Sequence, residues 1–183
     1  MINELEKDIL KVLVSEEEVK ARVVEMGEEL AKRFQGRSPL FLCVLKGSFV
    51  FMADLVRACQ LNSDMEFIAV SSYHNSTVSS GRVRINYDVQ QDITGRDIII
   101  IEDILDSGNT LAFLKDYLMT KGAATTTIVT LLDKPARRAK AVTADLAGFV
   151  VPDEFVVGYG LDYSQRYRNL PYIGVLKPEV YSK

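Results

Sequence analysis

Four consecutive isoleucines at residues 98–101 are the feature that most restricts what this chain can fold into. A strand without polar side chains must be covered on both faces, as in the parallel sheets of α/β proteins. The apolar run LFLCVL at residues 40–45 has the same character. Segments with apolar residues at helical spacing, such as residues 15–36 and 110–122, alternate with these runs. The pattern predicts an α/β fold, an open and mostly parallel sheet with helices on both faces, Rossmann-like in the broad sense.

The length and composition of the chain indicate one domain. Its 183 residues, of which 48% are hydrophobic, are enough for one well-formed core and few for two. We therefore expect residues 1–183 to form a single domain, with a small hood subdomain built from the N-terminal and C-terminal segments. Further strands are predicted at residues 8–15, 65–73, 83–88, 125–133, 154–162 and 172–176, and a further helix at residues 47–60.

Charge and cysteine content restrict the partners and the compartment. The net charge is −3 and the pI is about 5.3, so the chain lacks the basic excess that is usual in proteins that bind duplex nucleic acid. Two cysteines, Cys43 and Cys59, are too few for a disulfide framework and fit a reducing compartment. No apolar run approaches the roughly 20 residues that span a bilayer. We expect a soluble, cytoplasmic protein that binds neither nucleic acid nor membranes.

Acidic residues follow the isoleucine run directly. Glu102, Asp103 and Asp106 come first, and a glycine-containing turn at residues 107–110 then leads into the next predicted helix. Ligands of open α/β sheets bind at the carboxyl ends of the strands, and a helix N-terminus with free N–H groups binds phosphate. Carboxylates beside a phosphate would repel it unless a cation lay between them, and Mg²⁺ prefers oxygen ligands. The stretch therefore predicts a magnesium-dependent site for a phosphorylated ligand.

Other interpretations of this stretch can be compared on the residues. A P-loop is excluded here because the G-x-x-x-x-G-K-[ST] pattern is absent. A phosphoaspartate enzyme of the haloacid dehalogenase type would need Asp-x-Asp after its first strand, whereas Asp103 and Asp106 are three apart and late in the chain. A plain strand-to-helix loop with Asp106 as the helix N-cap stays open.

The order of residues 102–111, EDILDSGNTL, resembles the diphosphate-sugar signature of the type I phosphoribosyltransferases. The resemblance covers nearly the whole chain. Residues 42–57 resemble the pyrophosphate loop and the helix after it, and residues 71–85 resemble the flexible lid. LLDKPARR at residues 131–138 and the segment 151–176 are similar to the purine-binding parts of the branch that uses hypoxanthine and guanine. This resemblance implies transfer of the 5-phosphoribosyl group of 5-phosphoribosyl 1-diphosphate to a purine, with Mg²⁺ and with release of pyrophosphate.

The resemblance assigns roles in the signature segment. It implies that Glu102 and Asp103 face the ribose hydroxyls and their Mg²⁺, and that Asp106 accepts the proton of purine N7. Some members of the branch carry Lys at the position of Asn109, so Asn109 removes one possible charge contact with the phosphate. The residues expected to hold the 5′-phosphate are Ser107, Gly108, Asn109 and Thr110.

Three further segments correspond to the diphosphate site of the family. Lys46 and Gly47 resemble the pyrophosphate-binding pair, whose peptide bond is cis in the family, although a lysine at a strand end is also common. Arg168 matches the position that reaches pyrophosphate. Ser72 and Tyr73 open the expected mobile lid, about residues 71–82, which is rich in Ser, Thr and Asn. A polar run of this kind between strands is otherwise an ordinary loop.

The purine side rests on four residues. The ammonium of Lys134 can donate to an oxo group and cannot accept from an amino group, which favours 6-oxopurines over adenine. Phe155 resembles the aromatic residue that stacks on the purine. The backbone of Val156 resembles the group that forms a hydrogen bond with the edge of the purine. Both residues equally fit a core strand. Asp162 resembles a carboxylate near the purine or a second Mg²⁺.

Competing functions and some details stay open from the sequence. A sensor that binds 5-phosphoribosyl 1-diphosphate and regulates without catalysis would share the sugar site, but such regulators usually have a DNA-binding segment or a basic surface, which we do not expect in a net acidic chain. A scaffold role would leave the carboxylate cluster unexplained. The sequence does not rank hypoxanthine, guanine and xanthine. The resemblance implies a homodimer or homotetramer.

Overall fold

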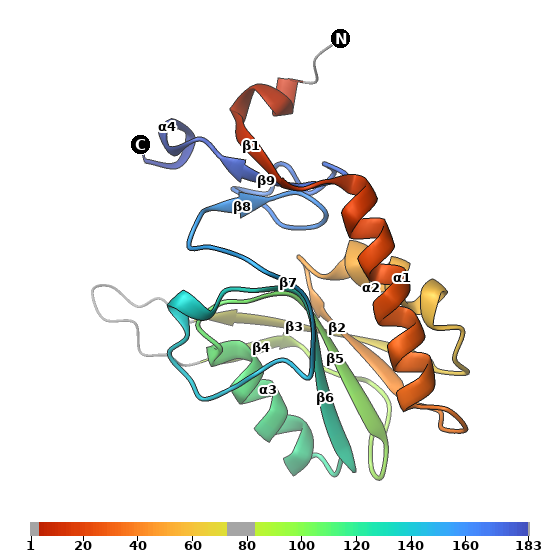
Figure 1. Ribbon diagram of the computed structural model, residues 1–183. Coiled ribbons are helices and arrows are strands. Elements are labelled where there is room, and N and C mark those ends of the chain that lie inside the picture. Colours follow the sequence, from red (N-terminus) through yellow and green to blue (C-terminus); the bar gives the residue numbers. More distant parts are fainter. Residues whose placement is uncertain (1–3, 73–82, 183) are drawn as a thin grey trace.

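The structure is a computed structural model that describes residues 4–72 and 83–182 (Figure 1). Tyr73 and most of the expected lid lie outside the described residues. The elements are η1 (Glu4–Asp8), β1 (Ile9–Val14), α1 (Glu16–Arg33), β2 (Leu40–Leu45), α2 (Phe49–Cys59), β3 (Asp64–Ser72), β4 (Val83–Tyr87), β5 (Asp97–Leu105), α3 (Asn109–Thr120), β6 (Thr125–Asp133), η2 (Pro135–Arg137), β7 (Leu146–Val150), β8 (Val156–Val157), β9 (Ile173–Leu176) and α4 (Pro178–Tyr181). None of the helices in the described part is long and apolar enough to cross a membrane.

A six-stranded sheet in the order β4-β3-β2-β5-β6-β7 forms the centre of the molecule. Neighbouring strands from β3 to β7 pair in parallel, and β4 pairs with β3 antiparallel at one edge. The predicted open, mostly parallel sheet is therefore confirmed. The sequence interpretation missed β7, whose Gly148 weakens a strand pattern. A Cβ atom at Gly148 would lie 2.5 Å from the carbonyl oxygen of Leu131, so this edge strand needs glycine there to approach β6.

The four isoleucines explain how the sheet is covered. Ile99 and Ile101 pack with α1 and α2 in one buried cluster, and Ile98 and Ile100 pack with α3 in another. Figure 1 shows α1 and α2 on one side of the sheet and α3 on the other. Helix α1 begins with a capping box, in which Ser15 accepts from the N–H of Glu18 and the Glu18 side chain bonds back.

A second, three-stranded antiparallel sheet, β1-β9-β8, brings the two ends of the chain together. We call this sheet, its connecting loops and α4 the hood. Figure 1 shows the hood as a separate layer above the edge of the large sheet at which the parallel strands end. The register places the ends of β2, β5 and β6 at that same edge, since Cys43 is opposite Ile101 and Leu105 is opposite Asp133. Side chains from three strands therefore meet beneath the hood.

Candidate active site

Two neighbouring carboxylates near the end of β5, Glu102 and Asp103, are partly withdrawn from water, which disfavours their charged forms. The strand continues to Leu105, so Glu102 and Asp103 belong to it and not to the turn after it. The Oε2 atom of Glu102 is buried without a hydrogen-bond partner among the described residues. Burial raises the pKa of Glu102 well above its ordinary value, and the charge of Asp103 raises it further. Burial also raises the pKa of Asp103, although the N–H of Ile104 and the charge of Arg168 oppose this shift.

The loop after β2 lies directly against this pair. A Cβ atom at Gly47 would be 1.6 Å from the Oδ2 atom of Asp103, so only glycine allows this approach. The cis peptide bond of the loop is Leu45–Lys46, one bond earlier than the Lys46–Gly47 peptide at which the resemblance placed it, a point that the sequence itself left open. Lys46, next to Gly47 in the sequence, is exposed. Ser48 is buried and donates to the carbonyl oxygen of Val44 at 2.5 Å, which holds the start of α2 against the strand end.

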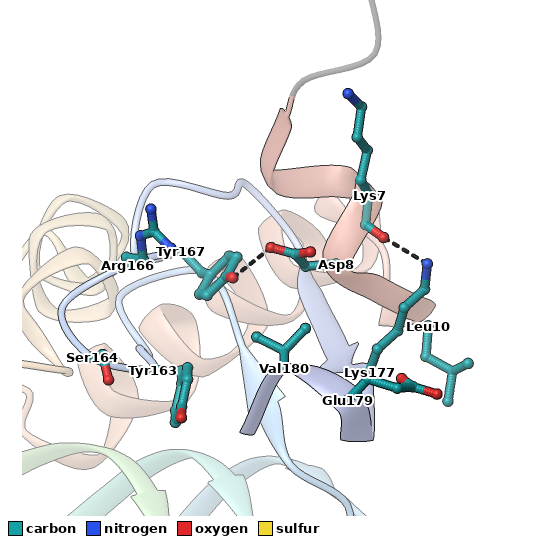
Figure 2. A pocket seen from close by; sticks show the side chains of 10 residues that line it. All are labelled: Lys7, Asp8, Leu10, Tyr163, Ser164, Arg166, Tyr167, Lys177, Glu179 and Val180. Carbon is teal, nitrogen blue, oxygen red and sulfur yellow. Dashed lines mark hydrogen bonds between the residues drawn. The ribbon is translucent and has the colours of Figure 1, made fainter. Parts of the chain in front are cut away.

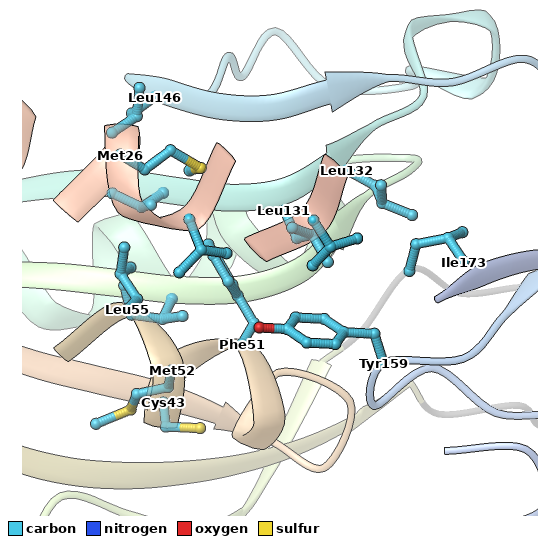
Figure 3. Packing of buried hydrophobic residues seen from close by; sticks show 14 of the residues in the cluster. Met26, Cys43, Phe51, Met52, Leu55, Leu131, Leu132, Leu146, Tyr159 and Ile173 are labelled. Carbon is cyan, nitrogen blue, oxygen red and sulfur yellow. The ribbon is translucent and has the colours of Figure 1, made fainter. Parts of the chain in front are cut away.

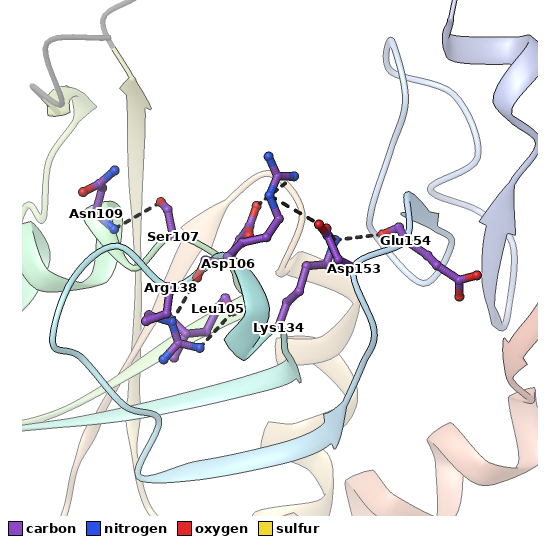
Figure 4. Close-up of polar contacts among 9 residues, drawn as sticks. Leu105, Asp106, Ser107, Asn109, Lys134, Arg138, Asp153 and Glu154 are labelled. Carbon is purple, nitrogen blue, oxygen red and sulfur yellow. Dashed lines mark hydrogen bonds and ion pairs between the residues drawn. The ribbon is translucent and has the colours of Figure 1, made fainter.

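The turn into α3 forms a small polar cavity of about 70 Å³. The N-cap of α3 is Gly108, with φ +82°, and no side chain caps the helix. The interpretation of Asp106 as the N-cap was therefore wrong. The N–H of Asn109 donates to the Ser107 hydroxyl at 3.4 Å (Figure 4), and the first turn of the helix carries the positive end of its dipole. The cavity is lined by Glu102, Ile104, Leu105, Asp106, Ser107, Gly108, Thr110 and Leu111.

An arginine to which the sequence analysis assigned no role supports this turn. Arg138 donates to the carbonyl oxygen of Asp106 at 3.0 Å (Figure 4). It also donates to the carbonyl oxygen of Val142 at 2.6 Å and pairs with Asp133. Arg137, next to it, lies 3.7 Å from the carboxylate of Asp106. Arg138 thus fixes the backbone of the turn while the Oδ1 atom of Asp106 stays buried without a hydrogen-bond partner among the described residues. Only its position after the strand end could have hinted at this role.

The hood contributes a cation to the same site. Arg168 forms an ion pair with Asp162 at 2.8 Å and donates to the carbonyl oxygen of Gly160 at 2.7 Å. Its charge lowers the pKa of Asp103 against the effect of burial, so Arg168 lies within electrostatic reach of the acidic pair. A Cβ atom at Gly160 would be 2.0 Å from the carbonyl oxygen of Gly47, which places the hood loop on the loop after β2.

The opposite side of the site contains a buried ammonium. Lys134 follows β6 and is 5% exposed, and its Nζ atom donates to the carbonyl oxygen of Glu154 at 2.8 Å and lies 3.9 Å from Asp153 (Figure 4). An ammonium has three donor hydrogens, so others can meet a ligand. Phe155, next along the hood, is partly exposed and stacks on Tyr181 with ring centroids 4.8 Å apart. Val156 is buried in β8, as expected of a core strand.

The donor set fits a hard cation that completes its coordination with ligand oxygens. The unpartnered carboxylate oxygen of Glu102 is the type of atom that Mg²⁺ prefers, and the neighbouring carboxylate of Asp103 offers the same type of ligand. Within residues 4–72 and 83–182, no group of three or more His, Cys, Asp or Glu side chains could hold a metal ion alone. Asp162, paired with Arg168, does not complete such a group. An ion at this edge would therefore need oxygens from a ligand or from water.

The comparisons with known proteins identify the family. Residues 13–164 match the family described as Phosphoribosyl transferase domain. The chain belongs to the phosphoribosyltransferase family. It is 55% identical over 177 residues to the hypoxanthine-guanine phosphoribosyltransferase of Bacillus subtilis. The match covers 97% of this chain and 98% of that protein. A crystal structure of a hypoxanthine phosphoribosyltransferase from Staphylococcus aureus superposes with a TM-score of 0.96, at 45% identity and with complete coverage of both chains.

A longer relative has the same region as one of its parts. The bifunctional protein TilS/HprT of Listeria innocua is 54% identical over 179 residues, which cover 98% of this chain. The phosphoribosyltransferase chain spans 28% of the length of that protein.

A larger cavity, of about 880 Å³, lies in the hood of the phosphoribosyltransferase (Figure 2). It is lined by Lys7, Asp8, Leu10, Tyr163, Ser164, Arg166, Tyr167, Lys177, Glu179 and Val180. None of the carboxylates of β5 or of the turn into α3 belongs to it, so its size does not locate the chemistry. Of the two expected lid residues, Ser72 ends β3 opposite Val83, and Tyr73 lies outside the described residues.

Proposed function

We propose that this phosphoribosyltransferase acts in purine salvage. It transfers the 5-phosphoribosyl group from 5-phosphoribosyl 1-diphosphate to N9 of a 6-oxopurine, hypoxanthine and also guanine, and releases IMP or GMP with pyrophosphate. One observation carries the proposal: unpartnered carboxylate oxygens of Glu102 and Asp106, the N-terminus of α3 with glycine as its N-cap, and the buried ammonium of Lys134 gather around the strand ends beneath the hood. A phosphorylated sugar and an oxo-bearing base would together engage all three.

The sugar side uses backbone and carboxylates. The N–H groups of residues 107–110, with the Thr110 hydroxyl, bind the 5′-phosphate at the positive end of α3. Glu102 and Asp103 would hold Mg²⁺, which when bound would supply the positive charge that offsets the diphosphate. The negative charge of this pair also favours the positive charge that develops on the ribose as its bond to the diphosphate breaks.

The leaving group lies between the hood and the loop after β2. Lys46, Gly47 and Arg168 bind the pyrophosphate, and the ion pair with Asp162 orients Arg168 toward it. Asp162 stays our candidate for a contact with the purine or with a second Mg²⁺. Ser72 and Tyr73 would cover the diphosphate when the lid closes, which would exclude water from the activated sugar.

The purine side supplies a base and a selective donor. Asp106, buried on one oxygen, accepts the proton of N7 while the new bond to N9 forms. Lys134 donates to the 6-oxo group and so disfavours adenine, whose 6-amino group offers no acceptor. Phe155 stacks on the purine ring, and the backbone of Val156 bonds its edge.

The deciding experiment is an assay of purine-dependent pyrophosphate release from 5-phosphoribosyl 1-diphosphate with Mg²⁺. We expect release with hypoxanthine and guanine, none with adenine, and loss of activity with a chelator. Binding of the diphosphate sugar without release with any purine would contradict the proposal and indicate a sensor. Comparing hypoxanthine, guanine and xanthine would also rank the bases.

We also propose a homodimer or homotetramer. Met65 and Phe67 on β3 and Tyr87 on β4 are 53%, 42% and 46% exposed. The pairings of Phe41 with Met65 and of Ala69 with Tyr87 place all three side chains on the sheet face that α1 and α2 cover farther along. Such a patch supports contact with a second copy. Sedimentation of wild type and of the F67E variant tests this. We expect F67E to dissociate, and an F67E assembly of the same mass as the wild-type assembly would contradict the proposed contact.

We propose that the protein works in the reducing cytoplasm. Its two cysteines are free and buried. Burial raises the pKa of Cys43 to about 11 and that of Cys59 to about 12, so both thiols stay protonated and unreactive at neutral pH. Fractionation of cells that express the tagged protein would locate it, and recovery outside the cytoplasm would contradict this.

A further inference from the structure

A tyrosine of the hood packs in the core between the large sheet and its helices α1 and α2. Tyr159 follows β8, has φ +49° and is 6% exposed. Its ring packs in the buried cluster that includes Phe51 and Ile173 (Figure 3). Its hydroxyl donates to the carboxylate of Asp54 on α2, 105 residues away in the chain. The hood and α2 are therefore joined by a hydrogen bond as well as by apolar packing.

Both partners are suited to a lasting bond. Burial raises the pKa of the Tyr159 hydroxyl, and the Asp54 carboxylate raises it further, so the proton stays on the phenol. Asp54 also forms an ion pair with Arg57, which lies three residues farther along α2. Arg57 thus holds one carboxylate oxygen while the other accepts from Tyr159.

The bond lies between two parts of the diphosphate site. Helix α2 begins at Phe49, directly after the loop with Lys46 and Gly47, so Asp54 fixes the helix that supports this loop. On the hood side, the N–H of Gly160 donates to the carbonyl oxygen of Arg168 at 2.9 Å, and Arg168 donates back. The residue next to Tyr159 is therefore bonded to the hood cation of the site.

We propose that the hydrogen bond between Tyr159 and Asp54 positions Arg168 relative to Lys46 and Gly47, and so sets the width of the diphosphate site. The inference rests on the proposed function and adds two positioning residues to it. Neither side chain touches the substrate. They act through α2 on one side and through the backbone of Gly160 on the other.

The experiment compares two tyrosines. Tyr159→Phe removes the hydroxyl and keeps the ring in its cluster. Tyr167→Phe is the matched control, because Tyr167 is also buried, also has a positive φ (+73°), and donates to Asp8 at 2.7 Å. Tyr167 packs within the hood and is next to Arg168 in sequence. A general loosening of the hood would therefore displace Arg168 in this variant as well.

Steady-state kinetics in both directions and thermal unfolding are measured for wild type and each variant. We expect Y159F to raise KM for 5-phosphoribosyl 1-diphosphate and for pyrophosphate about five-fold. This is less than the tenfold or more expected when a charged hydrogen bond to the substrate itself is lost, because the Tyr159–Asp54 bond acts on the site indirectly. Its KM for hypoxanthine should change less than two-fold. Y167F should leave all three KM values near wild type at a similar loss of melting temperature.

A double-mutant cycle with Asp54→Ala completes the test. The effects of Y159F and D54A on KM for the diphosphate sugar should not add, because both variants remove the same hydrogen bond. Additive effects, equal effects of Y159F and Y167F, or unchanged KM values in Y159F would each overturn the positioning role while leaving the proposed reaction intact. An inactive wild-type protein would instead overturn the proposed function, and the positioning role with it.

Discussion

Asp106 has one buried carboxylate oxygen without a partner among the described residues, next to a turn fixed by Arg138. If that oxygen accepts the purine proton, Asp106→Asn should lower kcat by about 10²–10⁴-fold, the usual contribution of a general base. KM for 5-phosphoribosyl 1-diphosphate should stay within about three-fold, because the backbone of the turn is unchanged. Steady-state kinetics with hypoxanthine measures both. Equal losses in kcat and in sugar affinity would show that Asp106 binds and does not catalyse.

Lys134 tests the purine side at the same scale. Lys134→Met keeps a long apolar side chain and removes the ammonium that donates to the Glu154 carbonyl oxygen. We expect KM for hypoxanthine to rise about tenfold or more, as for the loss of one charged hydrogen bond, with little change in KM for the diphosphate sugar. Unchanged purine kinetics would move the purine away from Lys134.

Among the elements, the turn that begins α3 depends on one glycine. Gly108 has φ +82°, and a Cβ atom there would lie 2.5 Å from Val142. Gly108→Ala should therefore shift the turn and raise KM for 5-phosphoribosyl 1-diphosphate by about tenfold or more. Gly95→Ala is the control, because Gly95 has φ +72° with no atom within 4 Å of the added Cβ. A similar rise in both variants would mean that backbone strain, and not the turn geometry, causes the loss.

At the level of strands and helices, part of the fold and of the site could be predicted from the sequence. The isoleucine run predicted a strand covered on both faces, and alternate isoleucines do pack on opposite helices. The acidic residues after it predicted the ligand edge because all parallel strands end there. Periodicity could not predict that Arg138 braces the turn, since that role depends on the approach of a segment 32 residues away. Strand β7 could not be predicted for a similar reason. Its Gly148 weakens the strand pattern, and that glycine is needed only because the backbones of β7 and β6 approach closely there.

At the scale of the whole molecule, the proposed site lies between the hood and the large sheet, so ligand binding should stabilise both. A ligand at 100 times its Kd stabilises the folded state by about 2.7 kcal/mol. For a chain of this size, that corresponds to a rise in melting temperature of about 5–10 °C. We expect this rise with 5-phosphoribosyl 1-diphosphate and Mg²⁺ together, and a smaller one with either alone. Thermal unfolding without any rise would contradict a metal-bound sugar phosphate at the end of β5.

The acidic pair should also lower the stability of the free protein. Burial and Asp103 raise the pKa of Glu102 above its ordinary value of 4.5, so the folded state holds the proton more tightly than the unfolded state. Stability therefore falls as the pH rises through the folded pKa, and Glu102→Gln removes this loss. Without ligand, the variant should melt above wild type at pH 7.5, with an advantage that shrinks toward pH 4.5. With the sugar and Mg²⁺ it should gain less than wild type. A variant less stable than wild type at pH 7.5 would show that the charge of Glu102 is already compensated in the free fold.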